Sequence, residues 1–470
     1  MKTSSYHRAL FIFRRDLRLE DNTGLIAVLK KSDSVIPCFI FDPQQVTSRN
    51  KFRSLYAVQF MIESLIDLKN QVAQRKGKLF IFYGSPDAVV KKLLPRYDID
   101  LVCMNRDYTP YSTARDQRIA KVCALRKIAC EFYDDVLLHA PGVVTKKDNK
   151  PYTIFTPFFK RAMRIKVATP QPLPAGKFFT KKFEGERAVL LTKLMSPLHK
   201  NIFVHGGRAE SLKILNNLEK FVHYARERDI PSLEKTTGLS AYLKFGTCSI
   251  REAYGAMVKT LGPHHPLVRQ LYWRDFFTQI ASYFPHVFGA PFYSKYQSIV
   301  WQNDKKKFAA WCQGQTGFPL VDAGMRQLNA TGFMHNRVRM IVASFLVKDL
   351  HIDWRWGERY FATKLVDYDP SVNNGNWQWA ASTGCDSQPY FRIFNPWLQQ
   401  KKFDRDCVYI KRWVPELRPF EPKIIHTWYK RSKTVKSAYP APLVDHNQES
   451  RCAKTMYLKA ICKAKKLSVD

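Results

Sequence analysis

The sequence of 470 residues lacks the features of membrane, secreted and zinc-binding proteins. It contains no run of about 18 uncharged apolar residues that could span a bilayer. Its N-terminus, Met1-Lys2-Thr3-Ser4, leads into a strand-like segment instead of a signal peptide. The ten cysteines include no C-x-x-C pair, which argues against structural zinc and a dense disulfide framework. We therefore expect a cytoplasmic protein with no membrane association and no bound metal.

Acidic residues are also scarce, because 76 Lys and Arg oppose 40 Asp and Glu and leave a net charge of +36. Such a surface attracts polyanions, and nucleic acid is the first candidate because its binding rests on neutralised phosphates. A general basic bias without any DNA contact would give the same count. The 45% hydrophobic and 25% charged residues are typical of globular proteins, and the length suffices for two or three domains.

Tryptophan is absent from the first 272 residues, since all ten lie between Trp273 and Trp428. This asymmetry divides the chain into two unlike halves. In residues 1–135, short apolar runs alternate with helical patterns such as Arg53–Lys69, which predicts an α/β domain with a doubly wound, five-stranded parallel sheet. The expected strands are His7–Phe13, Val35–Phe41, Leu79–Tyr83, Asp100–Met104 and Ala129–Tyr133.

Glycine is absent from the first βα turn, Arg14-Arg15-Asp16-Leu17-Arg18, so the dinucleotide-binding fingerprint is missing. Residues 136–205 read as a proline-rich connector, in which ten Lys or Arg between 140 and 182 face one acid, Asp148. Its charge could follow a DNA backbone, although a solvated linker explains it more simply. Residues 206–470 predict an all-α domain with a basic tail. Its expected helices are Ser211–Glu227, Ile250–Leu261, His265–Phe284, Val321–Asn329 and His335–Leu350.

Several segments of the helical half combine polar and aromatic side chains in ways that packing alone explains poorly. The hydroxyl-rich run Thr236-Thr237-Gly238-Leu239-Ser240 suits a phosphate, although taken alone it reads as an N-cap. Gln270, Trp273 and Arg274 share a helix face and could stack on a base and bind an anion.

Two further segments extend this pattern toward the C-terminus. Asn336, Arg339 and Met340 fall on one side of a predicted helix. Arg339 needs an acid if it is buried, and Asp367 or Asp369 could supply one. In the run 373–379, two tryptophans two residues apart point different ways on a helix, so that one can face a core and the other a cavity.

The combination of these segments resembles the photolyase/cryptochrome family and is most similar to its class I cyclobutane pyrimidine dimer photolyases. The likeness runs from Phe11 to about Tyr457, and its most specific motifs are Asn373–Gly384 and Tyr390–Pro396. It implies an α/β antenna domain, a long connector and an all-α domain that binds FAD. The implied activity is light-dependent repair of cyclobutane pyrimidine dimers in DNA, by electron transfer from photoexcited reduced FAD.

The resemblance also assigns residues to the cofactor. Arg339 and Asp367 resemble an ion pair around the flavin ring, and Asp369 would lie near the ring edge. Asn373 would sit at flavin N5, where a neutral amide tolerates both protonation states and favours the reduced flavin. The residues implied to hold the FAD phosphates and ribityl are Tyr224, Thr236, Thr237, Gly238, Leu239 and Ser240, assisted by Arg274.

Three tryptophans, Trp377, Trp354 and Trp301, match the family's electron-relay triad. A chain of oxidisable indoles would let light reduce the flavin by stepwise hole transfer to the surface. Burial in a helical domain would also explain clustered tryptophans. The other five tryptophans outside the lesion pocket are read as packing residues.

The lesion pocket implied by the resemblance would take a dinucleotide flipped out of the duplex. Its aromatic walls would be Trp273 and Trp379, while Met340 would line it and Asn336 would hydrogen-bond a base edge. The arginines implied to clamp phosphates near the lesion are Arg228, Arg337 and Arg392. UV-damaged DNA is therefore the implied partner of a monomer, with salt-sensitive binding.

The chain departs from the family pattern at two places. Gln270 stands where the dimer photolyases usually have Glu, and glutamine keeps the shape but cannot ionise. The family's (6-4) photolyases and animal cryptochromes also carry Gln there, so (6-4) repair and a photosensor without repair are the alternatives, although the segments 335–340 and 377–380 are of the dimer type. The stretch Tyr111–Asp116 departs from the folate-binding motif, which leaves a possible second antenna chromophore unidentified.

Overall fold

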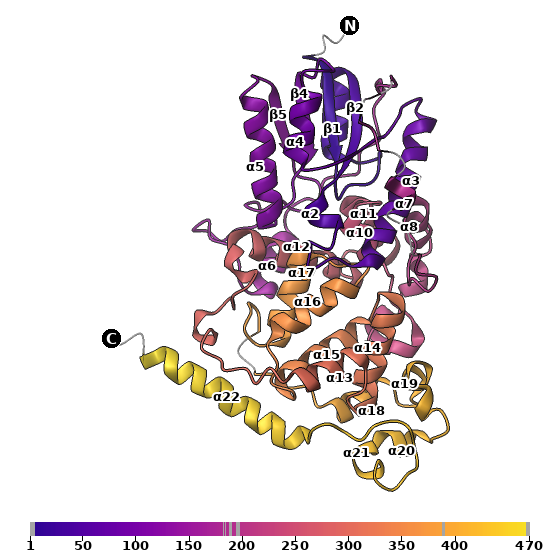
Figure 1. Ribbon diagram of the computed structural model, residues 1–470, viewed down its shortest axis with the longest axis vertical. Helices are drawn as coiled ribbons and strands as arrows, with labels where there is room; N and C mark the ends of the chain where they lie inside the picture. The colour runs from indigo at the N-terminus through magenta and orange to yellow at the C-terminus, as the bar shows by residue number, and fades with distance from the viewer. Residues whose placement is uncertain are drawn as a thin grey trace.

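The computed structural model describes residues 5–181, 183, 185–187, 190–193, 198–387 and 391–466, so Tyr390 of the motif 390–396 lies outside the described residues. The N-terminal part holds a five-stranded, all-parallel sheet of order β3-β2-β1-β4-β5, which confirms the predicted fold class (Figure 1). Its strands are β1 (Tyr6–Phe13), β2 (Ser32–Phe41), β3 (Phe80–Tyr83), β4 (Leu101–Asn105) and β5 (Ala129–Tyr133).

Helices cover both faces of this sheet. Phe11 and Phe13 of β1 pack in one cluster with side chains of α1 and α3, whereas Leu10 and Ile12 pack on the opposite face with α4 and α5. Because both faces are buried, the strands read as continuous apolar runs. The order reverses between β1 and β4, which makes their carboxyl ends the switch point of the sheet. The helices are α1 (Thr23–Lys31), α2 (Pro43–Val46), α3 (Leu55–Gln74), α4 (Pro86–Leu93) and α5 (Pro110–Ala124).

The connector contains two short helices, α6 (Phe155–Ala162) and α7 (Leu190–Lys193), and α6 is not a solvated linker. Phe155 and Phe158 of α6 are buried in the main hydrophobic cluster, while Lys160 and Arg161 are exposed. Aromatic side chains therefore fix this part of the basic segment against the helical region.

The rest of the chain is helical, as predicted, and within the described residues no helix is long and apolar enough to cross a bilayer. The α-helices are α8 (Arg208–Leu215), α9 (Tyr224–Glu227), α10 (Ser240–Phe245), α11 (Ile250–Leu261), α12 (Pro266–Tyr283), α13 (Lys305–Gln313), α14 (Pro319–Thr331), α15 (Asn336–Lys348), α16 (Trp354–Lys364), α17 (Pro370–Ala380), α18 (Pro396–Phe403), α19 (Val408–Trp413), α20 (Pro422–His426), α21 (Trp428–Arg431) and α22 (His446–Lys466).

The prediction of one helix over 211–227 was wrong. Helix α8 ends at Leu215, and a 3₁₀ turn at Leu218–Phe221 separates it from α9. Asn217 donates a hydrogen bond from its side chain back to the Lys213 carbonyl at 2.7 Å. Asparagine side chains compete in this way with the helical backbone ladder, so apolar spacing alone overestimates the helix.

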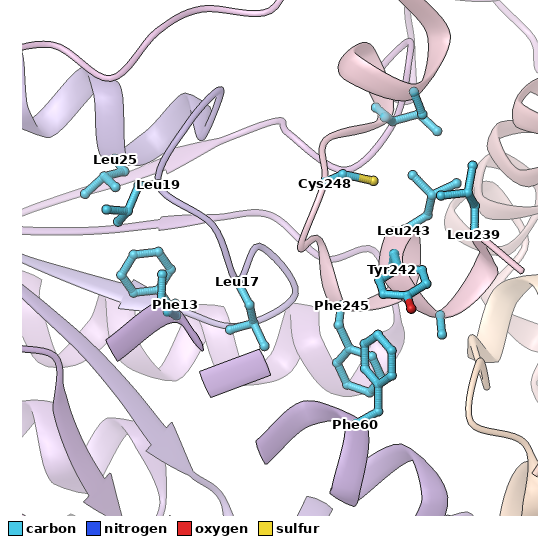
Figure 2. Close-up of a cluster of buried hydrophobic side chains, with 14 of the residues drawn as sticks. Phe13, Leu17, Leu19, Leu25, Phe60, Leu239, Tyr242, Leu243, Phe245 and Cys248 are labelled. Carbon is cyan, nitrogen blue, oxygen red and sulfur yellow. The ribbon is translucent and has the colours of Figure 1, made fainter. Parts of the chain in front are cut away.

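The helical region sits on the switch point of the sheet. Figure 2 shows Leu17, which follows β1, beside Phe60 of α3 and Phe245 of α10. The Phe60 and Phe245 rings lie 5.2 Å apart, and the Leu17 amide donates to the Phe245 carbonyl at 3.0 Å. A Cβ on Gly246 would stand 2.2 Å from the Arg15 carbonyl oxygen, so this contact requires glycine. The turn that lacks glycines is therefore covered by the helical region.

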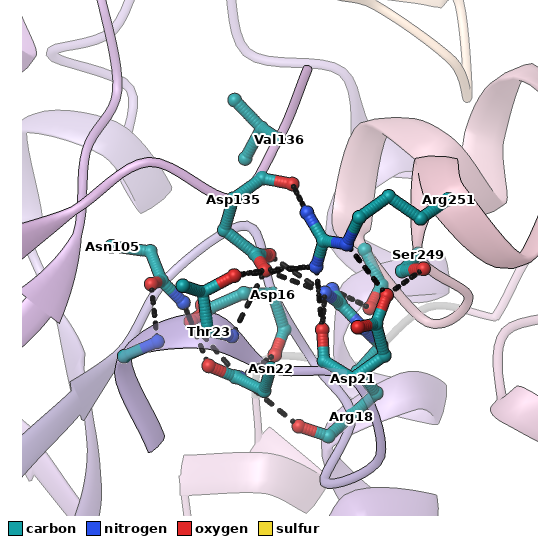
Figure 3. A network of polar contacts seen from close by, with 12 residues as sticks. Asp16, Arg18, Asp21, Asn22, Thr23, Asn105, Asp135, Val136, Ser249 and Arg251 are labelled. Carbon is teal, nitrogen blue, oxygen red and sulfur yellow. Dashed lines mark hydrogen bonds and ion pairs between the residues drawn. The ribbon is translucent and has the colours of Figure 1, made fainter. Parts of the chain in front are cut away.

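A buried charge network reinforces this contact (Figure 3). The Asp135 carboxylate accepts from Arg18 at 2.7 Å and from Arg251 of α11 at 2.8 Å, and Arg251 also pairs with Asp21 at 2.9 Å. Burial acts to raise the pKa of Asp135, but the two guanidinium groups outweigh it and hold that pKa below its usual value. Asp135 thus stays charged between the sheet and α11.

Replacing Arg251 with methionine should lower the free energy of unfolding by about 3–5 kcal/mol, because buried Asp21 loses its guanidinium partner and Asp135 loses one of its two. Urea unfolding of the full chain, followed by circular dichroism, measures the loss. Arg75→Met is the matched control, because the pair of Arg75 with Glu20 is largely exposed and should contribute at most about 1 kcal/mol. Equal effects of the two substitutions would contradict the structural role of the network.

Candidate functional site

One cavity of about 430 Å³ collects most of the residues singled out in the sequence. Helices α10, α12, α15 and α17 contribute side chains to it, together with the segment before α10. The predicted residues that line it are Tyr224, Arg228, Thr236, Thr237, Gly238, Leu239, Ser240, Gln270, Trp273, Arg274, Asn336, Arg339, Met340, Asp367, Asp369, Asn373, Trp377 and Trp379.

Four predicted residues do not line this cavity. Trp301 and Trp354 line a second, smaller cavity of about 100 Å³. Arg337 forms an ion pair with Asp229 at 2.8 Å, and the exposed Arg392 lies over the Trp379 ring at 5.3 Å from its centroid. The two arginines therefore stand beside cavity residues without facing the interior.

The acid that pairs with Arg339 is Asp367. The guanidinium donates to both carboxylate oxygens, at 3.3 and 3.0 Å, and its Nε donates to the Met334 carbonyl at 2.7 Å. Ser240 donates to the same carboxylate at 2.7 Å. This bidentate geometry fixes Arg339 in one orientation and ties the hydroxyl segment before α10 to the loop before α17.

Asp369 has a different partner, which lies in the other domain. Its carboxylate caps α17 by accepting from the Ser371 amide at 3.1 Å, and it also accepts from Arg15 of the turn after β1. Burial opposes ionisation, but Arg15 and then Lys244 outweigh it and lower the pKa of Asp369 below its usual value. No local sequence pattern indicates this long-range pair.

Glu358 supports the two adjacent asparagines of α17 through its backbone carbonyl and its buried carboxyl group. Asn373 donates from its side chain to the Glu358 carbonyl at 3.2 Å, and Asn374 donates to the Glu358 carboxyl at 3.0 Å. Asn373 itself lines the cavity. Burial raises the pKa of Glu358 to about 7, and the bond from Asn374 offsets this only in part.

Trp273 is held from behind by the connector. The ring of Phe155 in α6 stacks on it with centroids 3.6 Å apart and planes 5° from parallel, and Arg269 lies over Phe155 at 5.1 Å. Sequence reasoning missed Phe155 because it treated the connector as a solvated segment. The aromatic run 155–159 within a basic stretch was the signal that could have identified it.

Two of the predicted relay tryptophans are buried and one reaches toward the surface. Trp377 and Trp354 are 2% and 1% exposed, whereas Trp301 is half-buried. A Cβ on Gly357 of α16 would stand 2.2 Å from the Trp377 ring, so α16 and α17 approach closely one turn from Trp354. Trp311, which the sequence analysis interprets as a packing residue, is fully buried. The centroids of its ring and the Trp377 ring lie 6.2 Å apart.

The side chains around the main cavity fit FAD better than a metal. Hydroxyl groups, Lys244 and Arg274 suit an anionic diphosphate, and the aromatic and amide side chains of α12 and α17 suit a flat ring system. Within the described ranges, no group of three His, Cys, Asp or Glu side chains is placed to hold a metal ion.

Two family models match separate parts of the chain. Residues 9–177 match the DNA photolyase family, and residues 267–459 match the FAD binding domain of DNA photolyase. The deoxyribodipyrimidine photo-lyase of Vibrio cholerae is 36% identical over 479 residues, which covers 95% of this chain and 98% of the relative.

Two solved structures show the same likeness. An archaeal photolyase from Sulfolobus tokodaii, solved with two FAD molecules, is 44% identical with a TM-score of 0.87, covering 96% of this chain and 100% of that one. A cryptochrome from Synechocystis is 27% identical with a TM-score of 0.86, covering 97% and 100%. The chain belongs to the DNA photolyase family.

The Glu358→Gln variant tests the buried carboxyl group. Because the pKa of Glu358 is raised from 4.5 to about 7, unfolding releases a proton over that range and wild-type stability falls as the pH rises through it. Glutamine removes this dependence, so the stability of the variant relative to wild type should increase by about 3 kcal/mol between pH 5 and pH 8. Urea unfolding at both pH values gives the difference.

Glu416→Gln provides the matched control for this measurement. The hydrogen bond from Arg326 lowers the pKa of Glu416, so its stabilising contribution is already complete above pH 4.5. The free energy of unfolding that Glu416→Gln removes should therefore be the same at pH 5 and pH 8. A pH-independent effect of Glu358→Gln would contradict the raised pKa.

Proposed function

We propose that this protein repairs cyclobutane pyrimidine dimers in DNA by light-driven electron transfer from reduced FAD. The observation that carries the proposal is that one cavity combines a polar segment suited to FAD with an aromatic and amide pocket suited to flipped bases. The relatives with the name deoxyribodipyrimidine photo-lyase support the same reaction.

The cofactor would occupy the inner part of the cavity. FAD, when bound in its reduced form, supplies the photoexcited electron that splits the cyclobutane ring. Tyr224 and residues 236–240, with Arg274, would bind its phosphates and ribityl. Arg339 and Asp367 would flank the flavin ring, Asp369 would lie near its edge, and the neutral amide of Asn373 would accept a hydrogen bond from N5.

The lesion would enter between Trp273 and Trp379. Phe155 and Arg392 would support these two rings from outside, and Met340 would pack against the bases. Gln270 and Asn336 would hydrogen-bond base edges without adding charge. Arg228, Arg337 and Arg392 would bind phosphates beside the lesion, which makes the affinity fall as salt rises.

The tryptophans Trp377, Trp354 and Trp301 would carry an electron from the surface to the cavity. Their order of exposure supports this path, because the two inner rings are buried and the outer one is accessible. The protein would then restore the reduced cofactor by light without using the lesion pocket.

We also propose a monomer that works in the cytoplasm, with an antenna domain at 1–135, a connector at 136–205 and a catalytic domain at 206–470. The ten free cysteine thiols are consistent with a reducing cytoplasm. A second chromophore in the antenna domain is supported by the Sulfolobus tokodaii structure with two FAD molecules. An absorption spectrum of the purified protein identifies it by an additional near-UV or violet band.

The direct test uses UV-irradiated oligothymidine mixed with the fully reduced protein under blue light. Recovery of thymine absorbance is expected, and its absence would overturn the repair function. One observation favours the alternative of a photosensor without repair or of (6-4) repair, namely the neutral Gln270 in the cavity. Photoreduction without dimer binding would support the photosensor. Repair of (6-4) photoproducts, without repair of cyclobutane dimers, would support a (6-4) photolyase.

Gln270→Glu should raise the yield of repair per absorbed photon. A carboxyl group can form a charge-assisted hydrogen bond to the radical anion and can deliver a proton, and the difference of about 1 kcal/mol corresponds to about fivefold. Dimer affinity in the dark serves as the internal control and should change little. An equal or lower yield would mean that the pocket is adapted to the amide.

Trp301→Phe should slow flavin photoreduction by about tenfold or more. Oxidised Trp354 cannot take an electron from phenylalanine, so its positive charge recombines with the electron on the flavin. Repair by the chemically pre-reduced protein should persist. Trp311→Phe is the matched control, since Trp311 contacts Trp377 but has no exposed surface. Slower photoreduction in Trp311→Phe than in Trp301→Phe would redirect the path through Trp311.

A further inference from the structure

The turn after β1 brings an arginine of the N-terminal domain to the cavity. Arg15 pairs with Asp107 at 3.1 Å and with the cavity-lining Asp369, and its Nε donates to the Lys244 carbonyl at 3.2 Å. The Arg15 side chain is 12% exposed. The two domains therefore share one largely buried cluster of charges.

Lys244 is the member of this cluster whose ammonium group has no acid of its own. Both neighbouring carboxylates, Asp107 and Asp369, are paired with Arg15, and Arg274 contributes a further cation. Lys244, Arg15 and Arg274 therefore oppose two carboxylates, which leaves the cluster with an excess of one positive charge. Among the described residues, no hydrogen bond or ion pair is formed by the Lys244 ammonium group. A partly buried cation in this position is stabilised only if an anion joins it.

The position of Lys244 indicates where that anion would bind. Lys244 and Ser240 lie four residues apart in α10 and both line the cavity. Ser240 is fixed by its hydrogen bond to Asp367, so this face of α10 belongs to the same wall as the hydroxyl segment 236–240. A diphosphate bound along that wall would meet the uncompensated charge of the cluster.

We propose that Lys244 binds the diphosphate of FAD, and that Arg15 is a positioning residue that keeps Lys244 available by occupying Asp369. This inference rests on the proposed cofactor and adds Lys244 to its binding residues. It also gives a role to the turn 14–18, which is the point where the antenna domain reaches the cofactor cavity.

The titration of Lys244 makes the proposal measurable. Burial, followed by the charge of Arg15, lowers the pKa of Lys244 to about 8; Arg274 acts in the same direction, while Asp369 and Asp107 oppose it. A bound diphosphate would raise this pKa. Below pH 8 the lysine is protonated with or without FAD, so the affinity is flat; above pH 8, binding must take up a proton and the affinity falls.

The experiment measures release of oxidised FAD from the diluted holoprotein by flavin fluorescence between pH 7 and pH 10. For the wild type, the dissociation constant should be constant up to pH 8 and then rise about tenfold per pH unit. Lys244→Met should bind FAD about 10- to 100-fold more weakly at pH 7, without the pH dependence. Lys244→Arg should bind tightly and without this dependence, because the guanidinium stays charged.

Lys259→Met is the matched control, since Lys259 is exposed on α11 and does not line the cavity. It should reproduce the wild-type profile. If Lys244→Met binds FAD with the wild-type affinity and profile, the inference is overturned while the proposed function stands. If the wild-type protein binds no flavin, both are overturned.

A redox titration separates the diphosphate from the flavin ring as the anion. A contact with the diphosphate weakens oxidised and reduced FAD equally, so the midpoint potential of Lys244→Met should equal that of the wild type. A lower potential in the variant would assign Lys244 to the reduced ring and overturn the diphosphate assignment.

Arg15→Gln tests the positioning role. Without Arg15, Asp369 becomes a partner for the ammonium group and the pKa of Lys244 rises. The onset of pH-dependent FAD release should therefore move above pH 8, in a protein whose near-UV circular dichroism verifies the fold. An unchanged onset would show that Arg15 does not control Lys244.

Discussion

The approach of the Arg14–Arg18 turn to the end of α10 is the contact on which the cavity depends. Gly246 allows the two backbones to meet, and the Leu17 amide and Phe245 carbonyl join them. Once the backbones are in contact, Arg18 reaches the Asp135 network and Arg15 reaches Asp369. Apolar packing, buried charge and cavity electrostatics therefore all start from one turn of five residues.

The same contact explains why a doubly wound sheet can lack the glycine-rich fingerprint. Ligands of such sheets bind at the carboxyl ends of the strands, where the order reverses. Here that position is filled by the helical region, which covers the turn and supplies its own cavity. The sheet contributes charge to the site through Arg15 and Asp107, and binding surface comes from the helices.

The sheet and most helices could be predicted because their signals are local. Strands buried on both faces must be apolar throughout, and α11 appeared with its bounds unchanged at 250–261. The helix expected over 211–227 failed at Asn217, because side-chain competition for backbone hydrogen bonds does not alter apolar spacing.

The cavity residues were predictable as a set, but their partners were not. Arg339 was recognised as needing an acid; the residues alone left Asp367 and Asp369 open, and the family resemblance pointed to Asp367, with which Arg339 pairs in the structure. Arg15 and Asp369 are 354 residues apart, and Phe155 reaches Trp273 from a connector that composition describes as solvated. Such contacts depend on how domains dock, and no periodicity within one segment encodes this.

The charge distribution in the cavity follows from the same docking. Cations of both domains gather around Lys244, whereas Gln270, Asn336 and Asn373 offer amides. A diphosphate is anionic and the bases of a pyrimidine dimer are neutral, so the charged and the amide side chains of the cavity suit different parts of one complex. The net charge of +36 acts at long range on the DNA backbone, whereas inside the cavity the proposed interaction of FAD with Lys244 would depend on the local excess of one positive charge.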